Sequence, residues 1–187
     1  YAPPAPGGPL TLLVFGGSQG ARYFSDAVPP ALALLPADMR ARLKVVQQAR
    51  EEDLERVKAA YVAAGISAEI ATFFKDLPQR MAGSHLVVAR SGASSVAELT
   101  VLGRPSILVP LPHALDNDQL QNATRLAEAG GGWCLEQKTL TNERLAAEIG
   151  RLLSDSTALQ RAAAAAKTCG RPDAVKRLAD LAEELMK

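Results

Sequence analysis

Short runs of apolar residues recur along the chain, and longer stretches with helical periodicity separate them. In runs such as Leu10–Phe15 almost every residue is apolar, so both faces of the strand that the run forms must be buried. Strands of this kind belong to a parallel sheet that helices cover on both sides. The pattern therefore predicts an α/β fold, a doubly wound parallel sheet of about six strands. The predicted strands are Leu10–Phe15, Leu43–Gln47, Ala68–Thr72, His85–Ala89, Ser106–Val109 and Gly132–Leu135.

Helical patterns fill the gaps between these strands. The clearest covers Glu51–Ala64, where apolar residues recur at helical spacing and Gly65 provides the expected stop. A helix is also expected after Gly20, and Pro29-Pro30 predicts a break or kink in it, because proline lacks the amide hydrogen that a helix interior needs. The other predicted helices are Asn117–Ala129, Asn142–Leu153, Asp155–Thr168 and a last one that starts at Pro172.

Length, charge and cysteine content limit the classes of function. The 187 residues fit one domain over 10–187, preceded by a solvated Pro/Gly-rich linker over 1–9. Lysine and arginine number 21 against 20 acidic residues, so no overall field attracts nucleic acid. Cys134 and Cys169 fit a reducing compartment, and the apolar runs are too short to span a bilayer. We therefore expect a cytoplasmic domain that binds no nucleic acid.

A glycine-rich turn, Gly16–Gly20, follows the first predicted strand. Free amides and the positive end of the next helix converge there and suit a phosphate, and the Ser18 hydroxyl adds a donor. The alternative is a tight strand-to-helix turn in which the glycines only meet backbone geometry. The spacing is not that of a dinucleotide site, since the second strand ends in Gln47-Gln48 without a carboxylate, and no P-loop lysine follows. Nicotinamide or flavin cofactors and ATP hydrolysis are therefore disfavoured.

A second loop, Arg90–Ser95, also leads from a buried strand into a helix. It offers small side chains, exposed amides and hydroxyls, and Glu98 follows one turn later, where its carboxylate can accept both hydroxyls of a ribose. The same residues read as a capping box, in which Ser95 caps the helix and Glu98 bonds the first amide. Local sequence alone favours the capping box.

A third polar loop follows Pro110 and enters a helix near Gln119 and Asn122, whose amides suit sugar hydroxyls. Asp116-Asn117-Asp118 matches a short metal-binding pattern, but aspartate and asparagine are also common at helix starts. His85 and His113 have no second ligand at metal spacing, so we expect no metal site. In Phe73-Phe74, one ring can cover a base while the other fills the core, and core packing is the default expectation.

The order and spacing of these motifs, together with Gly103-x-Pro105 and Glu128-Ala129-Gly130, closely resemble the C-terminal domain of the MurG family, glycosyltransferase family 28, from about Leu10 to Lys187. This family transfers N-acetylglucosamine from UDP-N-acetylglucosamine to lipid I with inversion and makes lipid II for peptidoglycan. Its GT-B fold has two Rossmann-like domains. The resemblance implies that this chain is the isolated donor-binding half.

The resemblance also implies what the isolated half lacks. In the family, the N-terminal domain carries the acceptor site, the membrane-facing patch and the general base. We therefore expect this chain to bind the donor without catalysing transfer, with no catalytic residue of its own and no metal. The full-length protein is expected on the cytoplasmic face of the inner membrane. Alternatives are a separate donor-binding subunit of a two-component N-acetylglucosaminyltransferase, a UDP-sugar epimerase-like enzyme, or a non-catalytic sensor.

The resemblance assigns a role to each motif. It places the uridine near Phe74 and Ala93, the ribose hydroxyls on Glu98 and the diphosphate on the glycine turn. A pair that is Gln-Gln or His-Gln in the family holds the sugar; here it is Asp118-Gln119, and a carboxylate at the first position can only accept hydrogen bonds. The implied ligands are Gly17, Ser18, Phe74, Ala93, Ser94, Ser95, Glu98, Asp118 and Gln119, with Gly16, Arg90, His113 and Asn122 as secondary candidates.

Overall fold

Six parallel strands form one sheet in the computed structural model, which describes residues 1–112 and 117–185 but not the side chains at 18–21, 181 and 185. The strand order is β3-β2-β1-β4-β5-β6, as in doubly wound nucleotide-binding domains. The predicted fold class is confirmed, and every predicted strand end lies within one residue of the observed end. The strands are β1 (Leu10–Phe15), β2 (Leu43–Gln48), β3 (Ser67–Ala71), β4 (Leu86–Ala89), β5 (Ser106–Leu108) and β6 (Gly132–Cys134).

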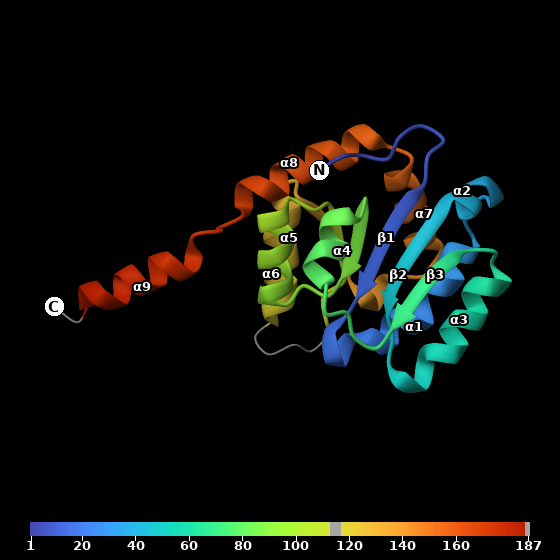
Figure 1. Ribbon diagram of the computed structural model, residues 1–187, viewed down its shortest axis with the longest axis horizontal. Coiled ribbons are helices and arrows are strands. Elements are labelled where there is room, and N and C mark those ends of the chain that lie inside the picture. Colours follow the sequence, from blue (N-terminus) through green and yellow to red (C-terminus); the bar gives the residue numbers. More distant parts are fainter. Residues whose placement is uncertain (113–116, 186–187) are drawn as a thin grey trace.

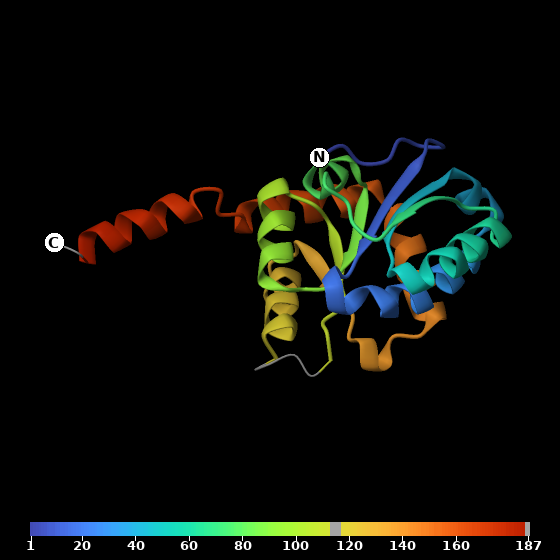
Figure 2. The same cartoon turned by 60° about the horizontal axis from the view of Figure 1, so that its bottom comes forward.

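Helices cover both faces of the sheet (Figures 1 and 2). Along β1, Leu12 belongs to the core cluster with α1, α3 and α7, whereas Leu13 belongs to the cluster with α4, α5 and α6. This alternation explains why nearly every position in the strand is apolar. The helices are α1 (Gly17–Ala33), α2 (Ala37–Arg42), α3 (Leu54–Ala63), α4 (Leu77–Gly83), α5 (Ala93–Leu102), α6 (Asp118–Glu128), α7 (Asn142–Leu153), α8 (Ser156–Cys169) and α9 (Ala174–Leu185), with 3₁₀ turns η1 (Glu51–Asp53) and η3 (Gln137–Thr139).

Helix α1 continues through Pro29-Pro30, so the predicted break is wrong. Proline at 29 leaves the carbonyl oxygen of Ser25 without its helical partner. That oxygen accepts a hydrogen bond from Nη1 of Arg56 at 3.4 Å, and Arg56 also pairs with Asp26 at 2.7 Å. The bond from Arg56 of α3 to the carbonyl of Ser25 thus compensates for Pro29, while the fully buried side chain of Val28 holds α1 against the sheet.

The N-terminal segment 1–9, which the sequence predicts to be a solvated linker, has no helix or strand, and most of its residues are exposed. The hydroxyl of Tyr1 donates to the carbonyl of His85 at 2.8 Å, and the hydroxyl of Ser156 donates to the carbonyl of Pro4 at 3.0 Å. Nε of Arg42 donates to the carbonyl of Gly8 at 2.8 Å. These bonds hold the segment against the body of the domain.

Helix α9 extends away from the body of the domain (Figure 1). It begins at Ala174, two residues after the predicted start, and its apolar side chains Val175 and Leu178 are 83% and 68% exposed. Within the described ranges, none of the helices combines the length and the apolar character that crossing a membrane requires.

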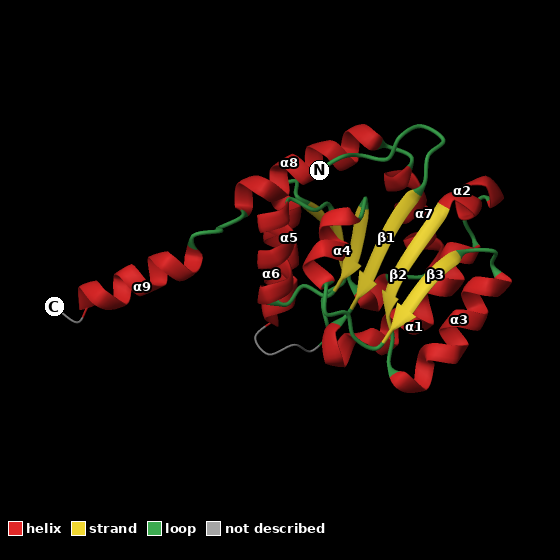
Figure 3. Ribbon diagram, viewed as in Figure 1, coloured by secondary structure: helices red, strands yellow, loops and turns green. Residues whose placement is uncertain are grey.

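The carboxyl ends of all six strands lie at one edge of the sheet, toward which the arrows in Figure 3 point. From β1 the chain continues through β2 and β3 in one direction, and from β4 through β5 and β6 in the other. Parallel sheets bind ligands at such a switch point, just outside the strand ends. Because Phe15 pairs with Ala89, the glycine turn after β1 and the loop after β4 start side by side.

Candidate functional site

A pocket of about 630 Å³ lies at the switch point of the sheet. It unites the turn after β1, the ends of β2 and β3, the start of α5 and the start of α6. Three motifs that the sequence singled out therefore share one cavity. The lining side chains and backbone that matter below are Gly16, Gly17, Gln48, Thr72, Phe73, Phe74, Arg90, Ser94, Ser95, Glu98 and Gln119.

The glycine turn presents its amides to a common acceptor. Gly16 has φ −129° and ψ 2°, and Gly17 has a positive φ of +64°. Both amides donate to Oε1 of Gln48, at 3.3 and 3.1 Å. Helix α1 has no acidic residue in its first turn, so the positive end of its dipole is uncompensated there. The Ser18 side chain lies outside what the structure describes.

Arg90 places a buried positive charge in the pocket wall. The residue is 6% exposed, and its Nη1 donates to the carbonyls of Val109 and Pro110, both at 3.0 Å. Nη2 donates to Oε1 of Gln137 at 2.7 Å, and the ring of Tyr23 lies 5.1 Å from the guanidinium carbon. Burial lowers the pKa of Arg90 to about 10, so the side chain stays protonated at neutral pH. Its hydrogen-bond partners in the described part of the chain carry no negative charge, so the site favours an anion.

Glu98 lies on the pocket side of α5 and is exposed. The capping-box interpretation is wrong, because α5 begins at Ala93 with Gly92 as its N-cap residue, and no side chain caps it. The helix starts earlier than the box requires, and the preceding Ser91 is held by a hydrogen bond from its hydroxyl to the carbonyl of Gln119 at 2.8 Å. With the described residues, Glu98 forms neither a hydrogen bond nor an ion pair. Its carboxylate is therefore free to accept hydrogen bonds from a ligand.

The two adjacent phenylalanines differ in burial. Phe74 is 7% exposed and Phe73 is 69% exposed, so core packing, the default expectation, holds for Phe74 and not for Phe73. Arg80 stacks on the Phe74 ring at 4.4 Å from its centroid and pairs with Glu69 and Asp76, both at 2.8 Å. This cluster fixes the segment after β3, and both phenylalanines belong to the residues that line the pocket.

Gln119 lies in the pocket lining at the start of α6. Its Oε1 accepts from the amide of Leu111 at 3.0 Å, which orients the side-chain amide. Asp118, the first residue of α6, is exposed and is not among the residues that line this pocket. His113 and Asp116 lie outside the described residues.

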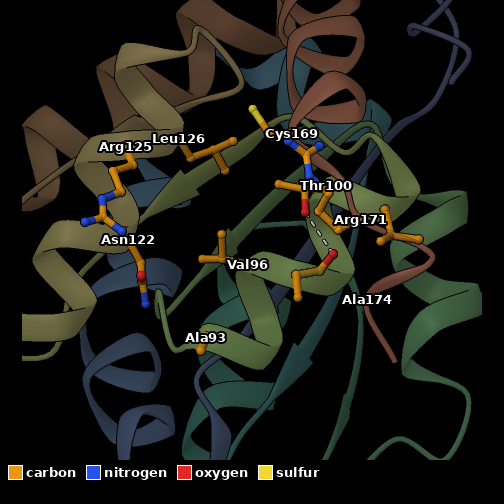
Figure 4. A pocket seen from close by; sticks show the side chains of 11 residues that line it. Ala93, Val96, Thr100, Asn122, Arg125, Leu126, Cys169, Arg171 and Ala174 are labelled. Atoms are coloured by element: carbon orange, nitrogen blue, oxygen red, sulfur yellow. Dashed lines mark hydrogen bonds between the residues drawn. The ribbon is translucent and has the colours of Figure 1, made fainter. Parts of the chain in front are cut away.

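Two other candidates line a second pocket instead, about 330 Å³ between α5, α6 and the junction of α8 with α9 (Figure 4). Ala93 and Asn122 lie on its wall, with mostly apolar neighbours. Nδ2 of Asn122 donates to the carbonyl of Ser91 at 3.1 Å, so this side chain supports the loop before α5. Neither residue is part of the lining of the first pocket.

Possible metal ligands are dispersed: within 1–112 and 117–185, no three His, Cys, Asp or Glu side chains come together as a metal site. The Nδ1 atom of His85 accepts a hydrogen bond from the amide of Thr11 at 2.9 Å. The prediction that the site works without a metal ion therefore still awaits a binding experiment.

Comparison with known families decides the classification. The model of the "Glycosyltransferase family 28 C-terminal domain" matches residues 11–178. The chain belongs to this family.

Curated relatives share this family 28 domain along nearly its whole length. The chain is 60% identical over 185 residues to the "UDP-N-acetylglucosamine--N-acetylmuramyl-(pentapeptide) pyrophosphoryl-undecaprenol N-acetylglucosamine transferase" of Methylobacterium nodulans, covering 98% of the chain and 50% of that protein. It is 55% identical over 180 residues to the enzyme of the same name from Rhodospirillum centenum, covering 96% and 48%. The chain therefore spans about half the length of the curated relatives that it matches.

One solved structure agrees with the family 28 assignment, and another shares the fold. The crystal structure of Acinetobacter baumannii MurG aligns with a TM-score of 0.86 at 30% identity, over 94% of this chain and 52% of that one. The glycosyltransferase VinC, solved in complex with dTDP, aligns with a TM-score of 0.64 at 21% identity over 96% of this chain and 43% of that one, which shows a shared fold only. The predicted C-terminal half of a GT-B glycosyltransferase is thus confirmed.

Sequence reasoning missed Gln48 and Gln137. Gln48 was considered only as a missing carboxylate, and Gln137 lies 47 positions from the arginine that it binds. Gln48 could have been found from its place at the end of a strand, because residues there face the ligand edge of a parallel sheet. Nothing local marks Gln137.

Proposed function

We propose that this chain is the donor-binding domain of an inverting transferase that moves N-acetylglucosamine from UDP-N-acetylglucosamine to lipid I, forming lipid II in peptidoglycan synthesis. The names of relatives that are 55–60% identical support this assignment. The observation that carries it is the pocket in which the glycine turn, the buried Arg90 and Glu98, which has no hydrogen-bond or ion-pair partner among the described residues, meet.

The diphosphate is expected to lie between α1 and α5. Both helices direct their N-terminal ends toward the pocket, and neither has an acidic residue in its first turn. Ser94 and Ser95 add hydroxyls, and Arg90 adds a buried charge whose effect a low-dielectric wall strengthens. Together these groups stabilise the negative charge of a departing UDP in the way that a metal ion does in other transferases. We therefore propose that donor binding is independent of metal.

The nucleoside and the sugar occupy the two sides of the diphosphate in this proposal. Glu98 accepts hydrogen bonds from the ribose hydroxyls, and the segment with Phe73 and Phe74 bounds the uracil. Gln119 binds the N-acetylglucosamine through the free side of its amide group, because Leu111 already bonds its Oε1. We assign no direct donor contact to the remaining residues predicted from the sequence, which are Ser18, Ala93, His113, Asp118 and Asn122.

The acceptor and the membrane belong to the part of the relatives that this chain does not span. We propose that lipid I and the cytoplasmic membrane surface are contacted by that part, and that the domain alone binds the donor without transferring sugar. Donor affinity is then lower than in the whole enzyme, since the contacts from the second half are missing.

Isothermal titration calorimetry of the purified domain in EDTA tests this proposal. UDP and UDP-N-acetylglucosamine should give saturable binding, whereas GDP, which has the same diphosphate and a different base, should bind at least about tenfold more weakly, about 1.4 kcal/mol. Equal affinity for UDP and GDP, or no saturation with either uridine ligand, would contradict the proposed site. Binding that EDTA abolishes and Mg²⁺ restores would contradict metal independence and direct attention to Asp116 and Asp118.

A further inference from the structure

One side chain links two walls of the pocket. Gln48 is the last residue of β2, which lies between β3 and β1 in the sheet, so the residue is at the ligand edge. Its Oε1 accepts from the amides of Gly16 and Gly17 at 3.3 and 3.1 Å, and its Nε2 donates to the carbonyl of Thr72 at 3.1 Å. The turn after β1 and the segment after β3 are thereby joined through a single amide group.

The glycine turn needs an acceptor from outside helix α1. The first amides of a helix have no partner within it, and Gly16, the N-cap residue, has no side chain to supply one. Gly17 has a positive φ of +64°, so the turn holds a conformation that the rest of the helix does not impose. Gln48 supplies the missing cap from a neighbouring strand.

We propose that Gln48 is a positioning residue that holds the diphosphate-binding turn in register with the Thr72–Phe74 segment, which bounds the base. The inference rests on the proposed function, because it concerns the same pocket. A donor that carries both a base and a diphosphate must contact both walls at once, so a fixed spacing between the walls lowers the ordering cost of binding.

The neutrality of Gln48 is part of this role. A carboxylate at this position can accept from Gly16 and Gly17, but it cannot donate to Thr72. It would also place a negative charge beside the diphosphate. Dinucleotide-binding domains use an acid at the end of the corresponding strand to hold a ribose. Here the proposed ribose contact belongs to Glu98 on α5, which leaves the end of β2 to a neutral side chain.

Two substitutions separate these effects. Gln48→Leu removes all three hydrogen bonds at nearly constant size, and Gln48→Glu keeps the acceptor and adds a charge. Gln160, which is exposed on α8, provides matched controls as Gln160→Leu and Gln160→Glu. Calorimetric titrations with UDP and with uridine measure affinity with and without the phosphates, and thermal unfolding reports whether each variant folds.

We expect Gln48→Leu to weaken UDP binding by about tenfold, about 1.4 kcal/mol, while uridine binding changes by less than about twofold. Gln48→Glu should weaken UDP binding further without unfolding the domain, and added salt should reduce the loss by screening the repulsion. Because this variant keeps the bonds to the turn, it remains informative even if Gln48→Leu does not fold. The Gln160 variants should bind UDP like the wild type.

The outcomes distinguish this inference from the function on which it rests. If both Gln48 variants bound UDP with the affinity of the wild type, the positioning role alone would be overturned. Equal losses for UDP and uridine would also overturn it, because they would show a general structural defect. If the wild-type domain did not bind UDP, the proposed function and this inference would fail together.

Discussion

Removal of the Glu98 carboxylate should weaken donor binding without affecting the stability of the domain. The side chain is exposed, lines the first pocket and makes no hydrogen bond or ion pair with the residues that the structure describes. Since no hydrogen bond or ion pair with these residues is lost, Glu98→Ala should change the free energy of unfolding by less than about 0.5 kcal/mol. Glu128→Ala is the matched control, because Glu128 is also exposed but lies at the far end of α6.

The size of the binding effect follows from the two hydrogen bonds that a carboxylate accepts from a ribose. Charge-assisted bonds contribute about 1.5 to 3 kcal/mol each, and the exposure of Glu98 favours the lower value. Two bonds then sum to about 3 kcal/mol, so Glu98→Ala should weaken UDP binding by about 100-fold. Glu98→Gln keeps an acceptor but loses the charge, and should weaken binding by about tenfold.

A double-mutant cycle assigns this loss to the ribose. Calorimetry would compare UDP with 2′,3′-dideoxy-UDP on the wild type and on Glu98→Ala. The wild type should bind the dideoxy ligand far more weakly than UDP, and the variant should bind the two ligands with nearly equal affinity. If Glu98→Ala weakened both ligands by the same factor, the carboxylate would act elsewhere and the ribose assignment would be refuted.

Three further perturbations probe the site and the core. Gly17→Ala should cost about 1 to 2 kcal/mol in urea unfolding, because φ is +64° although nothing crowds the position. Arg80→Met removes the stacking on Phe74 and two ion pairs; it should weaken UDP binding about threefold in calorimetry, with about 1 kcal/mol lost in stability. Burial raises the pKa of Tyr61 above the value of about 10 that it has when unfolded, so stability should fall as the pH rises above 10. Urea unfolding from pH 8 to 11 should show a shallower fall in Tyr61→Phe.

The sheet could be predicted from the sequence because the run of apolar residues within a strand shows by itself that both faces of the strand are covered. Residues such as Leu12 and Leu13 in β1 face opposite cores, and this produces the continuous apolar run that only a doubly covered strand requires. The local helix signals were less reliable. The prolines at 29 and 30 argue against a continuous helix, whereas Arg56, which is distant in sequence, donates a hydrogen bond to the carbonyl of Ser25.

The site motifs were predictable, whereas their connections were not. Glycine turns and the Arg90–Glu98 loop follow strand ends, and the parallel topology brings them to one edge. The capping-box prediction failed because the sequence of α5 is compatible with two start positions. In the structure the helix has the earlier start, and the Ser91 hydroxyl just before it donates to the carbonyl of Gln119. The partners of Arg90 lie 19, 20 and 47 positions away, so a local pattern cannot reveal them.

A crystal structure of the domain with UDP tests the central claim most directly. The account predicts a diphosphate at the amides that begin α1 and α5, and both ribose hydroxyls within hydrogen-bond distance of the Glu98 carboxylate. UDP bound in the second pocket between α5 and α6, or a ribose directed away from Glu98, would contradict it.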